Sequence, residues 1–110
     1  MIGHFDTAFV DDFEYFLNQL ESDDRLTPYH HSILMALWIQ YKSNHFIIPF
    51  PITRKKTLLF SRVNSIATYH KCMKDLEYFG FIVYLPSYNP KLGSQIFWSY
   101  NPRIWEPSIY

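Results

Sequence analysis

Residues 65–82, SIATYHKCMKDLEYFGFI, contain the start of a helix, its end and the start of a strand. Asn64 or Ser65 can cap the helix, because the side-chain oxygen of either accepts a hydrogen bond from the first turn. Gly80 marks its end, since glycine commonly follows the last helical residue. We therefore predict a helix from Ser65 to Phe79. Its apolar residues recur at helical spacing and predict a buried stripe of Ile66, Tyr69, Met73 and Leu76.

A β-hairpin is predicted after this helix. Residues 81–85 and 95–100 are rich in β-branched and aromatic side chains. The nine residues between them, 86–94, include two prolines and a glycine, which favour a loop. Residues 101–110 contain two more prolines and predict an irregular tail.

Three further helices are predicted upstream, at residues 8–21, 28–41 and 54–60. Thr27 and Thr53 are suitable N-cap residues for the second and third, and Pro28 suits a first helical turn. The second helix is apolar on more than one face, which is typical of a helix at the centre of a core. Residues 44–51 contain two prolines and predict at most a short edge strand at 46–48.

Length and composition favour one folded domain. The predicted elements place it in the α+β class, mostly helical with a C-terminal hairpin. Of the 110 residues, 20% are aromatic and only 18% charged, so apolar side chains for a core are abundant. The single cysteine, Cys72, excludes an internal disulfide and is predicted to be a small core residue. The longest apolar run is too short to span a membrane, and the acidic N-terminus is unlike a secretory signal. We expect a cytoplasmic protein.

Charge is divided sharply along the chain, although the formal net charge is zero. Residues 1–24 carry seven acids and no Lys or Arg, whereas residues 25–74 carry eight Lys or Arg and no acid. Such asymmetry suggests a polyanion partner for the middle segment.

The order of short helix, tight turn, longer helix ending at glycine, and hairpin resembles the winged helix-turn-helix superfamily. The resemblance rests on residues 52–59 (ITRKKTLL), 65–71 (SIATYHK) and 76–82 (LEYFGFI). One departure is the turn at 60–64, which lacks the glycine common in this superfamily. More narrowly, the sequence is similar to small winged-helix proteins of bacterial plasmids and conjugative elements. A second departure is the acidic N-terminal helix, which the superfamily does not require. We therefore divide the chain into an acidic helical extension at 1–26, the winged-helix domain that the resemblance implies at 27–100, and the tail at 101–110.

This resemblance implies double-stranded DNA binding, in transcriptional regulation or as an accessory to replication or excision of a mobile element. The helix from Ser65 would be the recognition helix and the hairpin the wing. Residues at its start that suit base edges in the major groove are Asn64, Ser65, Ala67, Thr68 and Lys71. Arg62 and Lys74 suit phosphate contacts, and Tyr88 and Lys91 lie on the wing.

Arg54, Lys55 and Lys56 supply an independent argument, because they occupy the first turn of a predicted helix. A cation there is disfavoured by about 0.3 to 1 kcal/mol, since the helix N-terminus is itself partly positive. An external phosphate would offset this cost, so we interpret the three residues as a phosphate clamp.

Three other interpretations of the charge pattern stay open. The acidic segment could neutralise the basic one within the monomer, or shield it from DNA. Alternatively, the protein is a non-enzymatic interaction module that uses its N-terminal helix to bind a copy of itself or a basic partner.

Catalysis and metal binding have little support. The sequence lacks a nucleophile elbow, a glycine-rich phosphate loop and a CxxC pair. His30 and His31 are adjacent, and His70 and Cys72 are two residues apart, so neither pair has helical ligand spacing. We expect that the protein is not an enzyme and that it binds no metal and no cofactor. We assign Trp38 and Trp98 to core packing.

Overall fold

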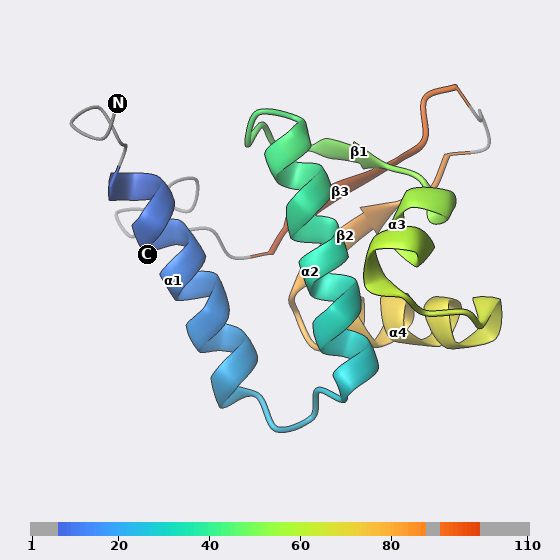
Figure 1. Ribbon diagram of the computed structural model, residues 1–110, viewed down its shortest axis with the longest axis horizontal. Coiled ribbons are helices and arrows are strands. Elements are labelled where there is room, and N and C mark those ends of the chain that lie inside the picture. The colour runs from blue at the N-terminus through green and yellow to red at the C-terminus, as the bar shows by residue number, and fades with distance from the viewer. Residues whose placement is uncertain (1–6, 88–90, 100–110) are drawn as a thin grey trace.

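Among the described residues, two pairs of helices are separated by one short strand and followed by two more strands, and the three strands form an antiparallel sheet in an α+β arrangement (Figure 1). The computed structural model describes residues 7–87 and 91–99, with side chains described from residue 12 onward. The described elements are α1 (Thr7–Ser22), α2 (Pro28–Ser43), β1 (Phe50–Ile52), α3 (Arg54–Ser61), α4 (Ile66–Tyr78), β2 (Ile82–Leu85) and β3 (Ser94–Trp98). The predicted α+β class and the four predicted helices are confirmed. The predicted tail at 101–110 and Tyr88 lie outside the described residues.

Local capping explains where three of the helices begin. Thr27, Thr53 and Ser65 each accept a hydrogen bond from the backbone N–H three residues on, at 3.4, 3.0 and 3.1 Å. Of the two candidates for the start of α4, Ser65 is therefore the cap. Gly80 ends α4 with φ of 86°, a left-handed conformation that glycine adopts without steric cost.

The sheet has the strand order β1-β3-β2, with both pairings antiparallel. The predicted hairpin is β2 and β3, and β1 adds an edge strand on the other side of β3. The predicted strand at residues 46–48 is wrong, because β1 begins at Phe50. His45 and Phe46 both have φ of 59°, a left-handed conformation that an extended strand cannot contain. Pro51 is tolerated in β1 because the strand is at the edge of the sheet.

Helix α2 lies at the centre of the core. Its residues Ile33, Leu34 and Leu37 are fully buried, and Figure 1 shows α1 on one side of it and α3 on the other. The aromatic ring of Phe16 in α1 lies 4.6 Å from that of Trp38 and 5.2 Å from that of Trp98. The prediction that both tryptophans serve packing is confirmed.

The buried stripe of α4 differs from the prediction at one position. Tyr69, Cys72, Met73 and Leu76 are buried, whereas Ile66 is 48% exposed. Ile66 is the first helical residue. The buried face includes Cys72 instead, so it follows a side of the helix on which Ile66 does not lie. The prediction that Cys72 is a core residue is confirmed, and burial raises the pKa of its thiol. No helix in the described part of the chain is long and apolar enough to cross a membrane.

Candidate nucleic-acid interface

The first turn of α3 consists of three exposed cations. Arg54, Lys55 and Lys56 follow the N-cap Thr53, and this turn contains no acidic residue. Within residues 12–87 and 91–99, none of the three cations forms an ion pair. Their charges therefore add to the partial positive charge of the helix N-terminus, which makes this turn a favourable place for an anion.

A buried polar network attaches this turn to α2. Gln40 is only 3% exposed, and its Nε2 donates a hydrogen bond to Thr57 Oγ1 at 2.9 Å. Its Oε1 accepts one from the backbone N–H of Thr53 at 3.3 Å. Thr57 Oγ1 in turn donates to Thr53 O at 2.8 Å. The α3 N-terminus is thus fixed by a side chain from another helix, a role that the sequence analysis missed. Gln40 is the one polar residue between Ile33 and Tyr41, which was the available signal.

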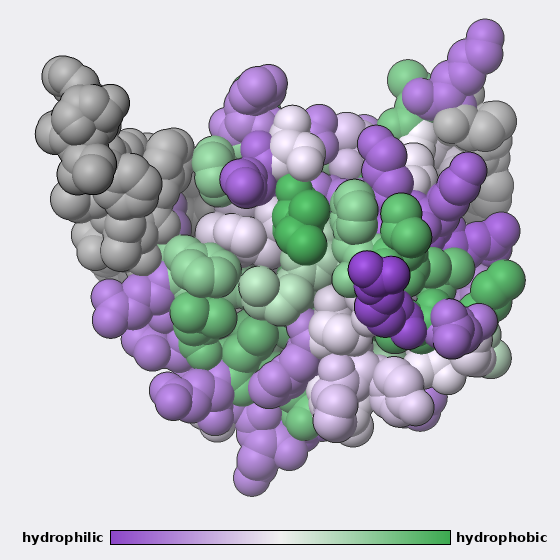
Figure 2. Space-filling view, in the orientation of Figure 1, coloured by the Kyte–Doolittle hydropathy of each residue, from purple (hydrophilic) through white to green (hydrophobic). Residues whose placement is uncertain are grey.

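Two surface hollows flank the start of α3, and residues of the hairpin loop line both of them. A hollow of about 350 Å³ is lined by Arg54, by His70 of α4 and by Tyr84 of β2, among others. A second hollow, of about 240 Å³, is lined by Lys56 and by Lys91 of the loop. Figure 2 shows hydrophilic side chains interspersed with apolar ones over this right-hand part of the molecule. The structure therefore groups the predicted clamp with the predicted wing residue Lys91.

Gly93 allows the hairpin loop to approach β1 this closely. Its φ is 68°, and a Cβ atom there would lie 2.7 Å from Ile52 O, well inside van der Waals contact. Tyr69 lies beneath the larger hollow, and burial raises its pKa to about 12. Its hydroxyl is therefore uncharged at neutral pH and does not repel an anion.

The outward face of α4 carries the remaining predicted residues. Asn64, Ala67 and Lys74 are exposed, and Thr68 is half-buried. Ser65 is exposed, but its side-chain oxygen serves as the N-cap of α4. Its first role is therefore structural.

Arg62 lies in the turn between α3 and α4. It is exposed and has φ of 62°, so an arginine occupies the left-handed position for which glycine is better suited. The neighbouring Val63 is 4% exposed and anchors the turn in the core. The turn without glycine is therefore made by Arg62, whose side chain reaches solvent.

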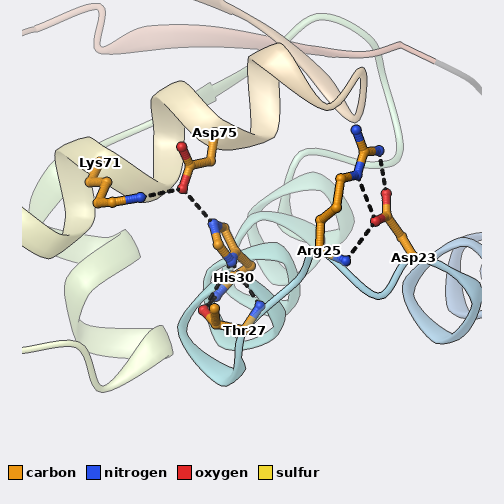
Figure 3. Close-up of polar contacts among 6 residues, drawn as sticks. All are labelled: Asp23, Arg25, Thr27, His30, Lys71 and Asp75. Atoms are coloured by element: carbon orange, nitrogen blue, oxygen red, sulfur yellow. Dashed lines mark hydrogen bonds and ion pairs between the residues drawn. The ribbon is translucent and has the colours of Figure 1, made fainter.

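Lys71, a predicted DNA-binding residue, forms an ion pair with Asp75 (Figure 3). Its Nζ lies 3.0 Å from Asp75 Oδ2, one helical turn further on. The same oxygen lies 2.9 Å from Nε2 of His30, a buried residue of α2. Hydrogen bonds from His30 and from Lys71 lower the pKa of Asp75. The sequence analysis missed this contact because residues 30 and 75 meet only in the folded protein.

The described part of the acidic segment, residues 12–24, makes little ion-pair contact with the basic segment. Between described residues of 1–24 and 25–74, one Lys or Arg ion pair is present, from Arg25 to Asp23 at 2.6 Å. Arg25 also lies over the ring of Phe79, 4.3 Å from its centre. Glu14, Glu21 and Asp24 are exposed, and α1 lies on the opposite side of α2 from α3 (Figure 1). Neutralisation within the monomer is therefore limited to one pair of the described residues.

The fold and its exposed cations define an α+β domain with a basic region around α3 and α4. Among the described residues, no three His, Cys, Asp or Glu side chains are grouped as metal ligands. No protein-family model matches the chain, and comparisons with curated proteins and with solved structures give no significant match. Arguments about function therefore depend on the residues themselves.

Proposed function

We propose that this domain is a winged helix-turn-helix that binds double-stranded DNA. Helices α3 and α4 form the helix-turn-helix, α4 is the recognition helix, and the β2–β3 hairpin is the wing. The order of these elements supports the assignment, together with the third strand that completes the sheet. In the narrower resemblance such domains serve bacterial mobile elements, in transcription, replication or excision, and we propose the same setting here.

The observation that carries the proposal is the group of exposed, unpaired cations at the start of α3. Charged surface residues are common, but they are usually interspersed with opposite charge. Here three consecutive cations occupy the helix end that repels them, without a described counter-charge. Phosphate groups of a DNA strand would reverse this unfavourable arrangement, because backbone N–H groups and side chains would then act together.

The remaining residues are assigned by their position on the fold. The N-terminal half of α4, with Asn64, Ala67 and Thr68, faces base edges in the major groove. Arg62 and Lys74 contact phosphates on either side of it. Lys91 lies with Lys56 along one hollow, so the wing and the clamp hold the same strand.

Replacing the clamp tests the proposal directly. In the triple variant Arg54→Ala, Lys55→Ala, Lys56→Ala, three phosphate contacts are lost. The slope of log affinity against log salt should therefore become shallower by about 2.7. The melting temperature should not fall and should rise somewhat, since the three side chains are exposed, have no described ion pair and are disfavoured at a helix N-terminus. Fluorescence anisotropy with a random duplex and thermal denaturation measure the two quantities.

Lys42→Ala is the matched control for the clamp variant. Lys42 is an exposed cation of the same basic segment, in the last turn of α2 rather than at the start of α3. We expect wild-type affinity for this control. If the triple variant binds as tightly as the control, the clamp assignment is wrong.

A second candidate function is supported by α1. Its outward side carries the exposed acids Glu14 and Glu21, and Leu17 between them is 40% exposed. A protein-interaction module would use this side to bind a second copy or a basic partner. Analytical ultracentrifugation without DNA would detect self-association, and substitution of Leu17 by Lys should then abolish it.

A further inference from the structure

Asp75 is an acid on the helix that is proposed to enter DNA, and it lies beside one of that helix's cations. A carboxylate close to bound DNA repels phosphate, so its presence there is unfavourable for binding. Its side chain is 24% exposed, whereas that of Lys71 is 76% exposed. The acid is thus mostly covered while the lysine that it holds stays accessible to a ligand.

His30 fixes the position of this carboxylate. The backbone N–H of Thr27 donates a hydrogen bond to His30 Nδ1 at 2.8 Å. Because a backbone N–H can only donate, Nδ1 must be the unprotonated nitrogen, and the ring proton is on Nε2. Nε2–H therefore donates to Asp75 Oδ2, 2.9 Å away. The ring is 4% exposed and is held at both nitrogens, so it keeps the carboxylate in place (Figure 3).

We propose that Asp75 is a built-in competitor for the DNA phosphate: it holds Lys71 in the free protein and gives it up when duplex DNA binds. This inference rests on the proposed DNA-binding function. The exchange is feasible because an exposed ion pair between residues one helical turn apart is weak. A phosphate can therefore displace the carboxylate, while His30 keeps Asp75 from following the lysine.

The consequence is a lower affinity than the cations alone would give. Lys71 must break its ion pair with Asp75 before it can contact a DNA phosphate, whereas Lys74 has no described ion pair to break. Asp75 would in this way reduce binding to arbitrary DNA and leave more of the discrimination to contacts with bases.

The substitution Asp75→Asn separates the charge from the hydrogen bond. The amide oxygen can still accept from His30 Nε2–H, but it no longer holds Lys71 by charge. We expect affinity for a random duplex at 50 mM salt to rise by about two- to fivefold, the range of an exposed ion pair. In the Lys71→Ala background the same substitution should have a clearly smaller effect, because only the general repulsion of phosphate is then removed.

Glu77→Gln is the matched control, since it removes the same charge from the same helix. The Glu77 carboxylate accepts a hydrogen bond from Tyr84 N at 3.1 Å rather than holding a lysine. If Asp75 acts only by general repulsion, Glu77→Gln will raise affinity as much as Asp75→Asn, and Asp75→Asn will raise it equally with and without Lys71. Either result would overturn the competitor role.

A second comparison does not require the Asp75→Asn variant to fold. Lys71→Ala should reduce affinity about two- to fivefold less than Lys74→Ala, because part of the Lys71 contact is offset by its release from Asp75. Equal losses would contradict the inference. If the wild-type protein binds DNA and these expectations fail, only the competitor role is wrong. If the wild-type protein does not bind DNA, the proposed function fails and the competitor role fails with it.

Discussion

Two polar networks connect α2 to the two helices of the proposed DNA-binding unit, and they differ in burial and in charge. The Gln40 network holds the start of α3 with neutral groups, and both Gln40 and Thr57 are buried. The His30 network holds α4 through the carboxylate of Asp75 and ends at the exposed ammonium of Lys71. The neutral network can serve only to fix a position, whereas the charged one can exchange a partner with a ligand.

This difference follows from where each network meets solvent. A buried hydrogen bond between neutral groups cannot be replaced by water without opening the core, so it is costly to break. An exposed ion pair loses little when water or another anion takes its place. The fold therefore combines a rigidly held start of α3, where we propose the phosphate clamp, with an adjustable contact on α4.

The largest effect is expected from Gln40→Met. Methionine has a similar size and shape but leaves the Thr53 N–H without its acceptor. Such a partly buried, unsatisfied donor, together with the lost bond to the buried Thr57, should reduce the free energy of unfolding by about 2 kcal/mol. DNA affinity should fall as well, since the clamp loses its anchor. Urea denaturation measures the stability.

Gln19→Met is the matched control for this substitution. Gln19 is a half-buried residue of α1 with no described side-chain hydrogen bond. A change within about 0.5 kcal/mol is expected there, as for most substitutions outside a network. If Gln40→Met is no more destabilising than Gln19→Met, the buried network does not hold α3.

A smaller effect, with a dependence on pH, is expected from the charged network. The His30 and Lys71 hydrogen bonds lower the pKa of Asp75 below that in the unfolded chain. Its stabilising contribution is therefore complete above about pH 4, the unfolded value, and is lost as pH falls through the lower folded value. Denaturation between pH 6 and 2 should show a shallower acid decline for Asp75→Asn than for wild type.

Gln40→Met distinguishes the two networks in the same experiment. Its stability should run parallel to that of wild type over this pH range, because the Gln40 network has no titrating group. Asp23→Asn supplies a second reference, since Arg25 lowers the pKa of Asp23 and that acid contributes in the same direction. An acid decline that is unchanged in Asp75→Asn would show that the His30 contact does not stabilise the folded carboxylate.

The sequence was sufficient where the signal is local. Thr27, Thr53 and Ser65 cap their helices and Gly80 ends one, because each acts on its own turn. The strand β1 could not be placed, since its position depends on pairing with β3, from Phe50 to Ile96. The proline-containing segment around it offered no local preference that was strong enough.

The candidate site was predictable as a set of positions but not as a set of contacts. Charge along the chain located the basic segment and the first turn of α3. Asp75 comes directly after the basic segment, so the charge count did not predict that it pairs with Lys71. Gln40 and His30 resembled ordinary helix residues, because hydrogen bonds between helices leave no periodic pattern.

The most direct measurement is the affinity of the wild-type protein for a random duplex at 50 and 200 mM salt. With about four to six phosphate contacts, the affinity should fall by roughly two to three decades between these concentrations. Binding that is undetectable at 50 mM salt, or that does not change with salt, would contradict a DNA-binding role for the cations of α3 and α4.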